Sequence, residues 1–181
     1  MDVSSYYVEG SGTLIDPMLP AEGLDWFEER RPPERVLLTI RHHYRDSDAF
    51  VNEFGIEVWC HEAGLHEFEG GPQVRGYSAG DTLAPGIQAL DFVGLSPDDT
   101  ALRIEATGGA LAFGDALVHF GGGRIGFVPD DLIGDDPEAI KRELRTGLEA
   151  LLDDDFEHLL FAHGEPLTGS GRRAFEALLG R

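Results

Sequence analysis

A strand–helix–strand pattern early in the chain is the feature that most constrains its fold. Residues 35–39 form a β-rich run that suits a strand buried on both faces. Asp46 or Ser47 can begin a helix that runs to Phe54, and residues 56–60 return as an apolar strand. Two parallel strands joined by a helix need a right-handed crossover, so this region predicts an α/β arrangement.

The other elements predict two mixed β-sheets flanked by helices, in a single domain over residues 1–181. Strands at 6–9 and 13–16 are joined by a glycine turn, and a short helix is expected over 22–30. From about residue 73 to 126 the chain is typical of a meander, with a hairpin turn at Gly121–Gly123. The later strands are expected at 73–77, 87–93, 101–106, 110–113, 124–127 and 158–162, with helices beginning at Asp136 and Ser170.

Charge and cysteine content exclude several classes of function. The chain has 34 acidic and 14 basic residues and a net charge of −20, a field that disfavours binding to nucleic acids or anionic membranes. The single cysteine, Cys60, excludes an intrachain disulfide, and its apolar surroundings indicate a small buried side chain. The N-terminal residues lack signal-peptide features, and no apolar run approaches the roughly 18 residues of a membrane span. A cytoplasmic protein is therefore expected.

Histidine and carboxylate side chains follow three apolar runs, at the places where a rigid sheet presents functional groups. Both groups are ligands for divalent metals. A carboxylate between apolar residues, as at Asp115, needs a partner, so a role in a site is favoured for it and for His163. The candidates are His42, His43, Tyr44 and Asp46 after the strand at 35–39, Asp115 after that at 110–113, and His163 after that at 158–162.

The candidates after the first strand also have purely structural interpretations. His42 can be a loop histidine bonded to the backbone, and Asp46 can be a helix N-cap. His43 is expected to point away from His42, where it is a substitute ligand at most. Tyr44 can bind substrate through its hydroxyl or pack on an apolar wall, and Arg45 can pair with Asp46 in competition with a metal.

Five separated segments, in order, resemble motifs of the metallo-β-lactamase superfamily. His42-x-Tyr44-x-Asp46-Ser47 resembles the His-x-His-x-Asp-His motif, with its second and third histidines replaced. The resemblance covers residues 5–179 and implies an αββα sandwich with the site at one edge of the two sheets. The other segments are Thr13 to Pro17 (Leu-Ile-Asp-x-Gly), Val93 to Leu102 (Gly-His-Thr-Pro-Gly), Leu111 to Leu117 (Phe-x-Gly-Asp-x-Leu) and Phe161 to Pro166 (His-Gly-x-Pro).

The resemblance implies an incomplete set of metal ligands. It assigns metal binding to His42, Asp46, Asp115 and His163, and orientation of the attacking water to Asp46. Tyr44, Ser47 and Leu95 stand where the family has metal-binding histidines. We therefore expect at most one divalent metal, zinc first and iron or manganese next, with Tyr44 and His43 as substrate-binding candidates.

Two functions remain open at this point. The first is a divergent hydrolase with a mononuclear metal site that acts on a small ester, thioester, amide or phosphoester. The alternative is a metal-free, non-catalytic member of the fold that binds a ligand or protein partner. Convergence of the four metal candidates favours the hydrolase. An Arg41 or Arg45 guanidinium between Asp46 and Asp115 favours the alternative.

Overall fold

The first half of the chain forms a mixed five-stranded sheet in a computed structural model that describes residues 2–181. The sheet order is β1-β2-β3-β4-β5, with β1 and β2 antiparallel and the other neighbours parallel. The predicted first hairpin is confirmed, and a 3-10 turn, η1 (Glu9–Ser11), joins its strands. The strands are β1 (Tyr6–Val8), β2 (Thr13–Ile15), β3 (Arg35–Leu37), β4 (Glu57–His61) and β5 (Val74–Tyr77).

The predicted strand–helix–strand unit is confirmed as β3, α1 and β4. Helix α1 (Ser47–Phe54) ends at Gly55, whose left-handed backbone (φ 65°) suits a residue without a Cβ. Phe50, fully buried on α1, belongs to the apolar cluster that joins the helix to the outer face of the first sheet. This packing holds α1 against the first sheet.

The second half forms another mixed five-stranded sheet, in the order β12-β9-β8-β7-β6. The predicted meander begins later than expected, because β5 pairs in parallel with β4 in the first sheet. Strand β6 was not predicted, and β7 is shorter than expected. The strands are β6 (Thr82–Ala84), β7 (Ile87–Ala89), β8 (Ala101–Ile104), β9 (Ala110–Phe113) and β12 (His158–Phe161).

A separate two-stranded hairpin holds β10 (Val118–His119) and β11 (Ile125–Gly126). All three glycines of its turn, Gly121–Gly123, have positive φ, which confirms the predicted hairpin turn. The hairpin also meets the end of β12, because the His119 N–H donates to the His163 carbonyl over 3.0 Å. It therefore contributes to the position of the loop that carries His163.

Helices cover the outer faces of both sheets. Helix α2 (Pro137–Ala150) begins as predicted, with the Asp136 carboxylate accepting the Ala139 N–H, and α3 (Gly171–Leu178) follows β12. The short helix expected at 22–30 is a 3-10 segment, η2 (Gly23–Phe27). The remaining 3-10 segments are η3 (Arg41–His43), η4 (Glu62–Phe68), η5 (Asp130–Leu132) and η6 (Leu151–Asp153).

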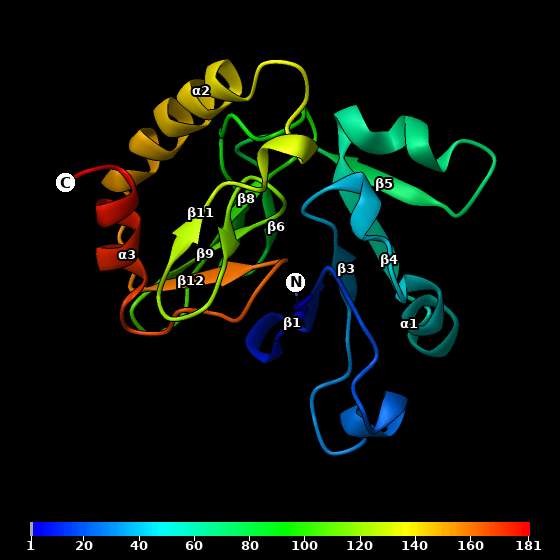
Figure 1. Ribbon diagram of the computed structural model, residues 1–181. Helices are drawn as coiled ribbons and strands as arrows, with labels where there is room; N and C mark the ends of the chain where they lie inside the picture. The colour runs from blue at the N-terminus through cyan, green and yellow to red at the C-terminus, as the bar shows by residue number, and fades with distance from the viewer. Residues whose placement is uncertain (1) are drawn as a thin grey trace.

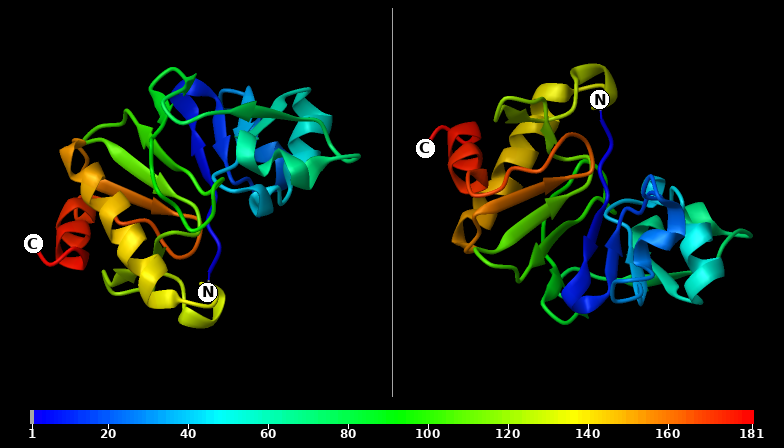
Figure 2. Two further views of the ribbon diagram at one scale, coloured as in Figure 1. Left: turned by 90° about the horizontal axis from the view of Figure 1, so that it is seen from above. Right: turned by 90° about the horizontal axis from the view of Figure 1, so that it is seen from below.

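The layers form the predicted αββα sandwich. Helices α2 and α3 lie on one outer side and α1 on the other, with the two sheets between them (Figure 1, Figure 2). One apolar cluster, which includes Ile15, Leu37, Leu102 and Ala112, fills the space between the sheets. Within residues 2–181, no helix is long and apolar enough to cross a membrane.

Candidate metal site

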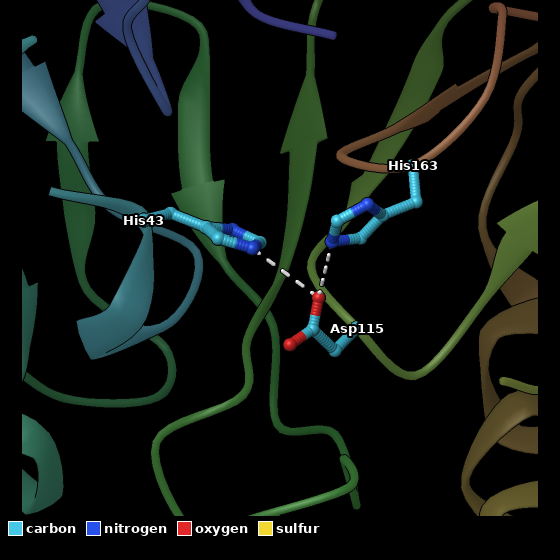
Figure 3. A group of neighbouring side chains, drawn as sticks. All are labelled: His43, Asp115 and His163. Atoms are coloured by element: carbon cyan, nitrogen blue, oxygen red, sulfur yellow. Dashed lines mark ion pairs between the residues drawn. The ribbon is translucent and has the colours of Figure 1, made fainter. Parts of the chain in front are cut away.

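Three side chains meet at the edge of the sandwich where β3, β9 and β12 end. They are His43, Asp115 and His163, and each follows its strand by a few residues (Figure 3). Asp115 Oδ1 lies 3.2 Å from His43 Nε2 and 3.0 Å from His163 Nε2. One candidate ligand atom from each residue lies within 4.8 Å of the other two.

The adjacent histidines His42 and His43 lie in a 3-10 turn that points their side chains in different directions. In this turn the backbone N–H of His43 donates to the Ile40 carbonyl over 3.0 Å. With three residues per turn, neighbouring side chains point about 120° apart. His43 is therefore buried in the site while His42 is exposed to solvent.

The structure does not bring His42 or Asp46 to the group. Asp46 precedes α1 at the N-cap position, but its side chain forms no cap bond and is exposed. Its Oδ2 instead accepts the Leu19 N–H over 2.8 Å, which ties the loop after β2 to the start of α1. Of the four predicted ligands, Asp115 and His163 lie together, and His43 takes the place expected for His42.

The three positions that depart from the family motif have structural contacts of their own. The Tyr44 hydroxyl donates to Asp48, and its ring packs 5.7 Å from that of Phe68. The buried Ser47 hydroxyl donates to the Tyr44 carbonyl. Leu95 packs against a small apolar cluster of Val118, Val128, Ile133 and their neighbours. These contacts agree with the packing interpretation of Tyr44.

Asp16, to which no role was assigned from the sequence, supports His43 from behind. Its Oδ2 lies 3.0 Å from His43 Nδ1 and accepts the Thr39 hydroxyl, while its Oδ1 accepts the Thr39 N–H over 2.8 Å. A carboxylate at one imidazole nitrogen fixes the tautomer and orientation that present the other nitrogen to a metal. The available signal was a lone carboxylate directly after the apolar strand β2.

Asp99 fixes the loop that carries Asp115. It is buried, and its carboxylate accepts the backbone N–H groups of Leu95 (2.9 Å) and Asp115 (3.3 Å). Burial raises the pKa of Asp99 to about 7. A Cβ on Gly114 would lie 2.6 Å from Asp99 Oδ1, so the close approach of these loops requires glycine there.

The charges of the group are strongly coupled. Burial opposes protonation of His43, but the adjoining carboxylates of Asp115 and Asp16 outweigh it and raise the His43 pKa to about 9. Burial would raise the pKa of Asp115, yet His163 and His43 hold it well below its usual range. Without a metal, the group is therefore a carboxylate between imidazoles, of which His43 is protonated at neutral pH.

These pKa shifts predict that metal binding strengthens as the pH rises. Since the raised pKa of His43 stabilises the metal-free protein, that contribution is complete below pH 6.5 and is lost as pH rises through about 9. A metal needs the neutral imidazole and must displace the proton. Titration of zinc affinity between pH 6 and 9 should show tighter binding at each step, and a flat profile would contradict this assignment.

The donor set fits one divalent cation. Asp115 Oδ1 is buried, and two imidazole nitrogens flank it. Metal bonds of 2.0–2.2 Å to a tetrahedral ion separate neighbouring ligand atoms by about 3.4 Å. The observed separations of 3.0 and 3.2 Å are close to that value. His43, Asp115 and His163 could thus hold an ion and leave a position open for water.

Comparison with solved structures identifies the fold. No family model and no curated protein matches the sequence. TTHA1623, solved in a di-iron-bound form, shares 27% identity with a TM-score of 0.69 over 96% of this chain and 91% of its own. A B3 metallo-β-lactamase with an active-site glutamic acid shares 15% identity with a TM-score of 0.60 over 98% and 82%. The metallo-β-lactamase family protein TTHA1429 from Thermus thermophilus shares 19% identity with a TM-score of 0.64 over 98% and 73%.

The chain therefore has the metallo-β-lactamase fold, as its motifs predicted. The similarity extends over nearly all of this chain and most of these three structures.

Proposed function

We propose that this protein binds one divalent metal ion through His43, Asp115 and His163 and uses it for hydrolysis. The observation that carries the proposal is the convergence of the buried Asp115 Oδ1 with the Nε2 atoms of His43 and His163, at 3.2 and 3.0 Å. Two histidines and one carboxylate are the ligand set of several catalytic zinc sites and of mononuclear iron sites.

The ligand count supports one ion. In residues 2–181, His43, Asp115 and His163 are the group whose ligand atoms lie close enough to share a metal. TTHA1623, the similar structure with the highest identity among those compared above, is in a di-iron-bound form, which supports iron as a candidate beside zinc. Manganese is the third candidate, because a site with a carboxylate and open positions for water can accept it.

The residues around the ion would position its ligands and leave one side open to substrate. A bound divalent ion supplies a water molecule of lowered pKa and polarises a carbonyl or phosphoryl oxygen. Asp16 holds the tautomer of His43, and Asp99 holds the loop of Asp115. The side chains of His163 and Asp115 are 29% and 24% exposed, against 7% for His43. Substrate would therefore approach from the side of His163 and Asp115.

The substrate class follows from the chemistry and the charge. A small ester, thioester, amide or phosphoester can be attacked by water on such a metal. The net charge of −20 repels highly anionic molecules, which favours the uncharged esters, thioesters and amides.

A substrate screen tests the hydrolase proposal. Wild-type protein loaded with zinc, iron or manganese would be assayed on chromogenic esters, thioesters, amides and phosphodiesters. The control is Asp115→Ala treated in the same way. Turnover that requires both metal and Asp115 supports the proposal. Equal turnover by the two proteins, or none by wild type that holds its metal, would reject hydrolysis.

The alternative is a metal-free member of the fold that binds a ligand or partner. Its support is the contact of His43 with two carboxylates at once, Asp16 on Nδ1 and Asp115 on Nε2. Among the described ion pairs, neither Arg41 nor Arg45 joins Asp46 to Asp115, so the predicted arginine-centred network is not its basis. Failure of the wild type to bind any of the three metals would favour this function.

A further inference from the structure

Arg45 ties together three backbone segments at the metal site. Its Nη1 donates to the carbonyls of Ser4 (2.6 Å) and Asp16 (2.8 Å), and its Nη2 lies 3.3 Å from the Ala162 carbonyl. Two of these carbonyls adjoin the site, because Asp16 supports His43 and Ala162 directly precedes His163. The guanidinium is thus fixed beside the metal ligands by contacts that leave little freedom to move.

The backbone at Arg45 is strained. Within residues 2–181, Asp16 (φ 47°) and Arg45 (φ 44°) are the two non-glycine residues with positive φ. This conformation is costly for a residue with a Cβ, and such strain is concentrated at functional sites. The two residues contact each other through the Arg45 Nη1 bond to the Asp16 carbonyl. A hydrogen bond therefore links the two residues with strained backbones, and one of them, Asp16, contacts His43.

The positive charge of Arg45 lies near Asp16, because Nη1 donates to the Asp16 carbonyl and the Asp16 carboxylate contacts His43. Burial lowers the pKa of Arg45, while the negative charges of Asp16 and Asp115 oppose that effect. A guanidinium remains protonated in proteins and has no lone pair with which to ligate a metal. It therefore adds a permanent positive charge beside Asp16, in addition to that of the protonated His43.

We propose that Arg45 is a fixed second cation of this site, which balances Asp16 and Asp115 and limits the affinity for the single divalent ion. This inference rests on the proposed metal binding by His43, Asp115 and His163. A positive charge held near the ion weakens its binding, since like charges repel across a partly buried site.

Three variants separate this role from that of a structural clamp. Arg45→Gln removes the charge, Arg45→Lys keeps it, and Arg75→Gln removes one charge from an exposed position on β5. Zinc affinity would be measured by competition with a chelating dye. The melting temperature of each protein would be measured in the absence of metal. We expect Arg45→Gln to bind zinc about tenfold more tightly than wild type, or about 1.4 kcal/mol. Arg45→Lys and Arg75→Gln should keep wild-type affinity, and Arg45→Lys should melt at a lower temperature.

Opposite results would overturn the proposal in distinguishable ways. If both Arg45 variants lose zinc affinity while the wild type still binds zinc, Arg45 acts only as a structural clamp. The proposed metal binding by the wild type would then stand. Unchanged affinity in Arg45→Gln would mean that its charge does not reach the ion. If Arg45→Gln does not fold, Arg45→Lys decides, because a clamp loses both affinity and stability there. If wild type binds no metal, the proposed function fails and this inference falls with it.

Discussion

Replacement of His43 by alanine is expected to abolish stoichiometric metal binding, whereas replacement of the adjacent His42 should leave it intact. The 3-10 turn sends the two side chains in different directions, so that His43 meets Asp115 at 3.2 Å while His42 faces solvent. Loss of an outer-shell partner already costs about 10–100-fold in metal affinity. Removal of a direct ligand from a set of three should cost more. Metal content after gel filtration and zinc affinity by dye competition measure the effect.

The paired variants make this prediction specific. Both remove an imidazole from the same turn, and they differ only in which face of the turn is changed. Thermal melting without metal would confirm that both proteins are folded. Metal loss in His42→Ala with retention in His43→Ala would contradict the site described above and restore the ligand set implied by the sequence motif.

Replacement of Gly164 by alanine is expected to lower the free energy of unfolding by about 3 kcal/mol or more. This loss is the sum of backbone strain and a steric clash. Gly164 follows His163 directly and has φ 100°, a region that residues with a Cβ rarely occupy. A Cβ there would lie 2.1 Å from the His119 carbonyl oxygen. The clash would move the His163 loop away from the β10–β11 hairpin. Urea unfolding of the metal-free protein measures the loss.

Gly169→Ala is the matched control for that variant. Gly169 lies in the same loop with φ 69°, but a Cβ there has no neighbouring atom within 4 Å. It should therefore show the backbone strain alone, about 1–2 kcal/mol. Equal destabilisation by the two substitutions would mean that the contact between Gly164 and His119 is not sterically tight.

Local sequence signals predicted most elements of the fold. Asp136 and the following proline indicated the start of α2, and the turns Gly10-Ser11-Gly12 and Gly121–Gly123 located two hairpins. These features depend on neighbouring residues. The sheet to which β5 belongs depends on pairing with β4, and no pattern within β5 records its partner. For the same reason the meander was predicted to begin one strand too early.

The site was predicted in part, for a similar reason. Asp115 and His163 each follow an apolar strand, and those strands end at one edge, so the two residues were expected together. Asp46 and His42 were assigned by motif spacing, but a 3-10 turn and a bond to Leu19 direct their side chains elsewhere. Asp16 and Arg45 act through contacts with distant segments, which a single sequence does not reveal.

Elemental analysis of the protein, purified without chelator or metal-affinity resin, tests the central claim most directly. Wild type and Asp115→Ala would each be incubated with Zn²⁺, Fe²⁺ or Mn²⁺, separated from free metal, and measured for metal per chain. The proposed site predicts close to one ion in the wild type and none in Asp115→Ala. Absence of metal from the wild type under all three conditions, or an equal amount in the variant, would contradict it.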